Sequence, residues 1–295
     1  MLPHLDAYRH TVDQELALAI DRLGEPSRLR DACAYACLNG GKRLRPILVL
    51  LIAEALPKKR DIMSAALSVE YFHAASLIAD DLPCMDNDDM RRSKPSLHKV
   101  FEESIAILAS YTLIAAGYGG IYETARILKQ KEPQSASDID AVAIACLEAV
   151  TRCAGLRGAT HGQYLDLFLT EPNYEAIRLV IERKTATLFE ISFLLGWLFG
   201  GGNRERINEV RQCAIHLGVA FQIADDLQDV LQDGKLPGGA NLAGILGVEK
   251  ATALFQEEFN GFVASLKNLG LWTSPFQEIC KALESGVKSM STTPV

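Results

Sequence analysis

The chain of 295 residues has no excess of positive charge. Its 30 Lys and Arg are outnumbered by 37 Asp and Glu, and its formal net charge is −7. Proteins that bind nucleic acid or anionic membrane surfaces generally offer a basic field. The sequence therefore predicts no nucleic-acid partner and no electrostatic attachment to a membrane.

Leader segments, long apolar runs and paired cysteines are also missing. No basic stretch followed by an apolar run stands near the N-terminus, and no apolar run reaches about 18 residues without a polar interruption. The seven cysteines are an odd number without a paired framework, which favours buried free thiols in a reducing compartment. We expect a cytoplasmic protein without stable membrane insertion.

Alternating stretches that would predict strands are absent as well, and aromatic residues make up only 7% of the chain. Apolar residues instead recur at spacings of three and four, which indicates amphipathic helices. We predict helices over residues 5–23, 29–38, 44–56, 60–80, 101–128, 138–155, 174–200, 204–232 and 248–268. The polar segment 129–137 resembles a helix–helix loop rather than a linker, so we predict one all-α domain over residues 1–295.

Two of these helices carry closely spaced carboxylates in apolar surroundings. The acidic clusters are Asp80, Asp81 and Asp86, and Asp225, Asp226 and Asp229. Buried carboxylates are unfavourable unless they are paired or coordinate a metal. Residues four apart share a helix face, where a hard divalent cation would relieve the repulsion between two carboxylates. The alternative interpretation of each cluster is a solvated acidic helix end. This interpretation is disfavoured because the same pattern occurs twice, each time after an apolar run.

The first cluster cannot lie on one regular helix, because Asp80 and Asp86 are six residues apart. We expect Pro83 to interrupt the helix so that the chain can bring Asp86 back towards Asp80.

Cations and hydrogen-bond donors accompany the carboxylates. They are Lys42, Arg43 and Arg45 in the segment GGKRLRP, His73 seven residues before Asp80, Arg91 and Arg92 after the first cluster, and Lys184 and Thr185 inside an apolar helix. Each has an ordinary alternative: a solvated loop charge, a structural histidine, or a lysine that extends along its helix to water. Together they predict a site for two anionic groups, one held through metals and one by direct cationic contacts.

The motifs GGKRLRP, HAASLIADDLPCMDNDDMRRSKPSLHK, GQYLD, KT and FQIADDLQD occur in an order and spacing that resemble the trans-isoprenyl diphosphate synthases, the farnesyl and geranylgeranyl diphosphate synthase family. The two extra residues in DDLPCMD resemble the bacterial and plant-type branch. The resemblance implies an all-α isoprenoid-synthase bundle around a central cavity, a homodimer, and Mg²⁺ as cofactor. It implies condensation of isopentenyl diphosphate with dimethylallyl, geranyl or farnesyl diphosphate.

The resemblance also implies a role for each matched residue. The metal ligands would be Asp80, Asp81, Asp86, Asp225 and Asp229, and the allylic diphosphate would contact Arg91, Lys184, Thr185 and Gln222. Catalysis would rest on Asp80, Asp81, Asp86, Lys184 and Asp225. Isopentenyl diphosphate would be held by Lys42, Arg45, His73 and Arg92, while Gln163 and Asp166 would help to shape the centre of the cavity.

Several positions depart from the family pattern. The lysine-bearing sequence that usually follows the second cluster is absent, with Lys235 as the candidate substitute. Glu102 stands where the family has glycine, and Tyr111 stands where it has an acid. Only Lys288 lies near the C-terminus, where a basic end is usual. These departures bear on affinity and rate rather than on the class of reaction, because both acidic clusters are present.

Product length should depend on the helix that leads to Asp80. Ala75 lies five residues earlier, about 7.5 Å along the helix, and its small side chain leaves the path open. Tyr71 or Phe72 would stop the chain about one turn further, which is roughly one isoprene unit. We predict geranylgeranyl diphosphate, with fifteen-carbon farnesyl diphosphate as the alternative. Tyr111 and Tyr118, on a facing helix, could shorten this path.

Two other classes compete with this interpretation. A class I terpene cyclase also ionises allylic diphosphates, but it would not need a second diphosphate site. A non-catalytic regulatory subunit of a prenyl synthase would fit the shortened sequence after Asp229, but it should have lost an acidic cluster.

Overall fold

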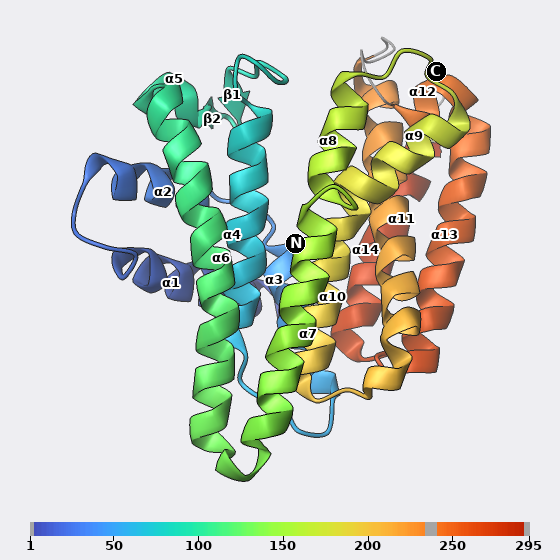
Figure 1. Ribbon diagram of the computed structural model, residues 1–295. Coiled ribbons are helices and arrows are strands. Elements are labelled where there is room, and N and C mark those ends of the chain that lie inside the picture. Colours follow the sequence, from blue (N-terminus) through green and yellow to red (C-terminus); the bar gives the residue numbers. More distant parts are fainter. Residues whose placement is uncertain (1–2, 234–240, 292–295) are drawn as a thin grey trace. The chain divides into compact units, whose positions relative to one another are not determined.

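The computed structural model describes residues 3–233 and 241–291, and this part of the chain is almost entirely helical (Figure 1). Its internal contacts define two compact units. The first unit comprises Pro3–Glu148 with Leu195–Gly202, and the second comprises Ala149–Leu194 with the described residues from Asn203 onwards. The predicted all-α class is confirmed.

The first unit is built around a pair of long helices, α4 and α6, which run side by side (Figure 1). Its elements are α1 (Pro3–Asp21), α2 (Arg28–Leu38), α3 (Leu44–Ala55), α4 (Met63–Asp80), β1 (Met90–Arg91), β2 (Lys94–Pro95), α5 (Leu97–Phe101), α6 (Glu103–Lys131), η1 (Pro133–Ser135) and the larger part of α7 (Ala136–Ala154).

Small residues let α4 and α6 approach closely. A Cβ at Gly117 would lie 2.6 Å from the Phe72 ring, and the Ser110 hydroxyl donates to the Ala75 carbonyl oxygen at 3.1 Å. The Phe72 ring also packs edge-on against Tyr118, with ring centroids 5.2 Å apart. This packing fixes the direction of α4 and therefore the position of Asp80 at its end.

Although no apolar run of about 18 residues without a polar interruption was expected, helix α6 is long and apolar enough to cross a membrane by length and mean hydropathy. In its most apolar 18-residue window, 33% of the residues are buried. A core helix passes the same test, and α6 packs along α4.

The second unit is a bundle of longer helices joined by short ones. Its elements are α8 (Ala159–Leu167), α9 (Tyr174–Val180), a π-helix η2 (Ile181–Ala186), α10 (Thr187–Gly200), η3 (Arg204–Arg206), α11 (Ile207–Asp233), α12 (Leu242–Leu246), α13 (Val248–Leu269) and α14 (Ser274–Ser291). Fully buried Phe193 is central to the core, since its ring centroid lies 6.3 Å from that of Phe262 and 6.4 Å from that of Phe276. The last residues of α10 belong to the first unit.

The predicted helices are present, but the sequence pattern missed α5, α8, α12 and α14. The first three are only five to nine residues long, too short to show a helical period. Helix α14 carries apolar residues at helical spacing, Phe276, Ile279, Cys280, Leu283 and Val287, so its pattern was present in the sequence and was overlooked.

The expectation that strands are not needed was wrong for one short hairpin, in which Met90 pairs with Pro95 and Arg91 with Lys94. Its two-residue turn consists of Arg92 and Ser93, with φ of 53° and 61°. Such turns usually carry Asn-Gly or Asp-Gly, so Arg92 and Ser93 carry no hairpin signal in the sequence.

Candidate active site

In the first unit, the acidic cluster forms where α4 ends. The helix finishes at Asp80, the chain turns through Pro83, and the Asp86 backbone N–H donates to the Asp80 carbonyl oxygen at 2.9 Å. The interruption expected at Pro83 is therefore present, and it brings Asp86 back beside Asp80. Asp80 is half-buried and Asp86 is exposed.

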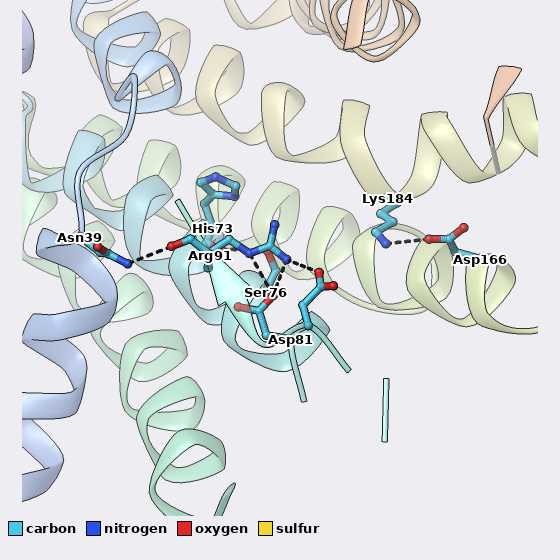
Figure 2. A network of polar contacts seen from close by, with 8 residues as sticks. Asn39, His73, Ser76, Asp81, Arg91, Asp166 and Lys184 are labelled. Atoms are coloured by element: carbon cyan, nitrogen blue, oxygen red, sulfur yellow. Dashed lines mark hydrogen bonds and ion pairs between the residues drawn. The ribbon is translucent and has the colours of Figure 1, made fainter. Parts of the chain in front are cut away.

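The middle carboxylate of this cluster, Asp81, faces inward and is paired with Arg91. Asp81 is only 3% exposed, and it accepts hydrogen bonds from Arg91 Nε, at 2.9 Å, and from Arg91 Nη2 (Figure 2). Arg91 Nη2 also donates to Asp88 at 3.1 Å. The hydrogen bond to Asp81 raises the pKa of Arg91. Asp81 thus orients a cation that the sequence assigned to the substrate.

His73 lies in a positively charged part of the same unit. Its Nε2 atom is 3.3 Å from Arg45 Nη1. Burial, followed by the charges of Arg45, Arg92, Arg43 and Arg91, lowers the pKa of His73 well below its usual range. The imidazole is therefore neutral at pH 7 and can accept a hydrogen bond from Arg45. Arg45 beside a neutral histidine, with Arg92 nearby, favours the binding of an anion.

The glycines of GGKRLRP accommodate Arg92. The Arg92 guanidinium donates to the Gly40 carbonyl oxygen, and a Cβ at Gly41 would lie 2.6 Å from Arg92 Nη1. Gly40 and Gly41 have φ of 80° and 123°, which side-chain-bearing residues rarely adopt. The exposed Lys42 follows directly.

Arg43 is a residue whose importance sequence reasoning missed. Its guanidinium is buried and donates to Asp13 at 2.7 Å, to the Cys37 carbonyl oxygen at 2.6 Å, and to Glu70. It is also the N-cap of α3, with φ of 51°. GGKRLRP offers three cations, and nothing in the sequence indicated that Arg43 turns into the core.

In the second unit, the π-helix presents Lys184 and Thr185 to partners on two other helices. The Lys184 ammonium contacts Asp166 of α8 at 2.7 Å (Figure 2). The Thr185 hydroxyl donates to Gln222 Oε1 of α11 at 2.9 Å, and Gln222 Nε2 donates to Asp226 at 2.9 Å. These contacts orient three residues that the sequence assigned to the allylic diphosphate. Gln163, also predicted for this site, is half-buried on α8.

Asp226 is the inward-facing carboxylate of the second cluster. It is 3% exposed and accepts a hydrogen bond from the Leu242 backbone N–H at 2.8 Å. Burial raises the pKa of Asp226 to about 6, and the charges of Asp229 and Asp225 act in the same direction. Asp226 therefore anchors the start of α12. Asp225 is half-buried and Asp229 is exposed.

The two clusters share one arrangement that fits Mg²⁺. In each, the middle carboxylate is buried and accepts hydrogen bonds from protein donors, and the two flanking carboxylates are more exposed, Asp80 with Asp86 and Asp225 with Asp229. Among residues 3–233 and 241–291, no three His, Cys, Asp or Glu side chains form a complete metal-binding group. Mg²⁺ usually retains several waters and takes one or two carboxylates together with substrate phosphates, so the carboxylates present suit a site that the substrate completes.

The two aromatic residues considered for product length face different helices. The Phe72 ring lies against Gly117 and Tyr118 of α6. The pKa of Tyr71 is raised by burial and then by Cys37 and Cys33 of α2. Ala75 is 2% exposed.

The departures from the family pattern lie mostly at the surface. Tyr111 is 65% exposed, and Lys288 pairs with Glu284 at 2.6 Å. Lys235 lies outside the described residues. All seven cysteines are free thiols, but Cys84 is exposed, contrary to the expectation that all are buried.

Comparisons with known proteins agree with this geometry. A sequence profile described as polyprenyl synthetase matches residues 26–239. The heterodimeric geranylgeranyl pyrophosphate synthase large subunit 2 of Arabidopsis thaliana is 36% identical over 265 residues, which cover 84% of this chain and 67% of that protein. The farnesyl diphosphate synthase of Geobacillus stearothermophilus is 37% identical over 234 residues, which cover 77% and 74%.

Solved structures are similar over nearly the whole chain. An FPP/GFPP synthase from Zymomonas mobilis has a TM-score of 0.79 at 29% identity, covering 97% of this chain and 100% of that one. A geranyltransferase from Legionella pneumophila has a TM-score of 0.80 at 28% identity, covering 96% of each chain.

Proposed function

Because this chain belongs to the polyprenyl synthetase family, we propose that it condenses isopentenyl diphosphate with dimethylallyl, geranyl or farnesyl diphosphate to give geranylgeranyl diphosphate. The chain is a short-chain trans-prenyltransferase; its starters and its product length belong to the proposal. The observation that carries the proposal is the pair of acidic clusters, each with its middle carboxylate held by the protein and with oriented donors beside it.

We assign the accessible carboxylates Asp80, Asp86, Asp225 and Asp229 to Mg²⁺, which when bound neutralises charge on the leaving diphosphate. Asp81, which the resemblance also assigned to the metal and to catalysis, and Asp226 contribute indirectly in this proposal. Asp81 orients Arg91, and Asp226 orients Gln222.

The cations and donors hold the two substrates. Arg91, Lys184, Thr185 and Gln222 bind the allylic diphosphate, while Lys42, Arg45, His73 and Arg92 bind isopentenyl diphosphate. The bond between the allylic carbon and the diphosphate oxygen breaks, and the electron pair leaves with the diphosphate. The double bond of isopentenyl diphosphate then attacks the allylic cation, and the released diphosphate takes up the proton lost from the product. Positioning both reactants supplies much of the rate.

Two substitutions test the metal assignment. Asp80→Ala and Asp225→Ala should each lower turnover by orders of magnitude, because the departing charge is no longer neutralised. Asp140→Ala is the matched control, since Asp140 forms an exposed ion pair with Lys129 at 2.7 Å. Near-normal turnover in both test variants would refute the assignment.

Product length is tested by chromatography of products formed from each allylic starter. Phe72→Ala should lengthen the product, since it removes the ring beside Tyr118, whereas Tyr71→Phe should not. A dominant fifteen-carbon product from the unmodified enzyme would support the farnesyl alternative, which the similarity to a farnesyl diphosphate synthase keeps open. Turnover without isopentenyl diphosphate would indicate a cyclase instead.

We further propose a homodimer in the cytoplasm. The exposed apolar residues of α6 support a second copy as partner; they are Ile107, Leu108, Tyr111, Ile114 and Tyr122. Light scattering of the purified chain at micromolar concentration should give twice the mass of 32.2 kDa. An inactive monomer that gains activity only with another prenyl synthase chain would favour the regulatory subunit.

A further inference from the structure

The π-helix Ile181–Ala186 interrupts an otherwise α-helical stretch between α9 and α10. A π-turn holds more residues than an α-turn and therefore changes which side chains face a given neighbour. Lys184 and Thr185 are adjacent, yet each reaches a different helix, with Lys184 at Asp166 of α8 and Thr185 at Gln222 of α11.

Helix α8 contacts the backbone of the π-helix at a glycine. Gly162 is buried, and a Cβ there would lie 2.2 Å from the Lys184 backbone nitrogen and 2.6 Å from the Arg183 carbonyl carbon. The neighbours are main-chain atoms, which cannot turn aside as a flexible side chain can. One helical turn later, α8 places Asp166 against the Lys184 ammonium.

Helix α11 makes a second contact of the same kind. Gly218 is buried, and a Cβ there would lie 2.5 Å from Ala186 Cα and 2.7 Å from Ala186 Cβ. Four residues later Gln222 accepts the hydrogen bond from Thr185, and three residues beyond is Asp225. Gly218, Gln222, Asp225 and Asp229 therefore share one face of α11.

We infer that Gly162 and Gly218 are positioning residues that clamp the π-helix between α8 and α11 and so set where Lys184 and Thr185 meet the allylic diphosphate. The inference rests on the proposed diphosphate role of those two residues. A methyl group at Gly162 displaces the backbone of Lys184 itself and separates the ammonium from Asp166. A methyl group at Gly218 pushes Ala186 away from α11 and breaks the contact between Thr185 and Gln222.

The test compares Gly162→Ala and Gly218→Ala with Gly286→Ala, a control in α14 where a Cβ meets no atom within 4 Å. Steady-state kinetics should show the KM for the allylic diphosphate at least tenfold higher in both clamp variants. Their KM for isopentenyl diphosphate should stay within twofold, and Gly286→Ala should match the unmodified enzyme in both constants. Circular dichroism confirms the helical fold of each variant.

The inference is overturned if Gly162→Ala and Gly218→Ala both fold and keep the KM for the allylic diphosphate within twofold. It is also overturned if the KM values for the allylic diphosphate and for isopentenyl diphosphate rise equally, or if both variants fail to fold. If only one variant fails to fold, the kinetics of the other variant decide. Lys184→Ala separates the inference from the proposed function. If Lys184→Ala leaves the KM for the allylic diphosphate unchanged, the proposed diphosphate role of Lys184 is refuted. If Lys184→Ala raises this KM while Gly162→Ala and Gly218→Ala do not, only the positioning role of the two glycines is refuted. Gly162→Ala should add less than twofold in the Lys184→Ala background, because both changes act through one ammonium.

Discussion

At the scale of single residues, the conformation of Glu102 explains one departure from the family pattern. Glu102 joins α5 to α6 with φ of 74° and ψ of 157°, a region that is essentially restricted to glycine. Gly247 joins α12 to α13 with nearly the same angles, 81° and 155°. The ion pair of Glu102 with Arg28 is exposed on both sides and contributes little. Glu102 therefore carries strain that glycine would relieve.

Glu102→Gly should raise the free energy of unfolding by about 1 kcal/mol, since relief of backbone strain exceeds the entropy that glycine gains in the unfolded chain. Urea denaturation measures the change. Glu103→Gly, at the first residue of α6, is the control and should lower the free energy of unfolding, because it removes an acidic side chain from the helix N-terminus. A loss of stability in Glu102→Gly would contradict the strain.

His73 gives a pH dependence at the same scale. Its pKa is lowered in the folded state, so the unfolded chain takes up a proton first as the pH falls. Stability from the neutral imidazole is complete above the unfolded pKa of about 6.5 and is lost as the pH falls below it. Between pH 7.5 and pH 5.5 the unmodified protein should lose about 1 kcal/mol more than His73→Gln. Urea melts at the two pH values measure this, and equal losses in the two proteins would contradict it.

At the scale of elements, a buried ion pair ties several helices of the first unit together. Arg43 at the start of α3 reaches Glu70 in α4, Asp13 in α1 and the Cys37 carbonyl oxygen at the end of α2. The side chains of Arg43 and Glu70 are 1% and 4% exposed. Because Arg43 lies between Lys42 and Arg45, the same contact fixes the segment assigned to isopentenyl diphosphate.

Glu70→Ala should lower the free energy of unfolding by about 3–5 kcal/mol, because it leaves a buried guanidinium without its main partner. Adding Arg43→Met should recover a large part of this loss, since no buried charge then remains uncompensated. Thermal and urea unfolding of the single and double variants would show this. A double variant that is less stable than Glu70→Ala would contradict the explanation.

At the scale of the whole molecule, the boundaries between the two units fall inside helices. Helix α7 begins in the first unit and ends in the second, and α10 does the reverse. The end of α10 is attached within the first unit, where Arg60 donates to the Phe199 carbonyl oxygen at 3.1 Å and to Glu132 at 2.7 Å. Unfolding one unit alone would therefore interrupt two continuous helices.

We expect a single cooperative unfolding transition, in agreement with the prediction of one domain. Scanning calorimetry should show one peak with equal calorimetric and van't Hoff enthalpies, both counted per cooperative unit. Arg60→Ala should move the whole peak to lower temperature because it removes the hydrogen bonds to the buried Phe199 carbonyl oxygen and to the partly exposed Glu132. Two separate peaks, only one of which responds to Arg60→Ala, would show that the units unfold independently.

The sequence by itself determined the helical class, most helix positions and both acidic clusters. Helical periodicity depends only on residues that are close in the chain, because residues three and four apart share a helix face wherever the helix lies in the fold. The interruption at Pro83 was likewise predictable, because the ring constrains its own chain. The matched motifs also assigned cations and donors to an anionic substrate, and that assignment is part of the proposed function.

Only the tertiary structure decided which members of each group face inward. Asp81 pairs with Arg91 of a hairpin that has no turn signal, and Asp226 receives its donor from Leu242, sixteen residues away. Arg43 and the contacts of Gly162 and Gly218 depend on other helices in the same way. These arrangements follow from close approach between distant segments of the chain, and no local period in the sequence records such distances.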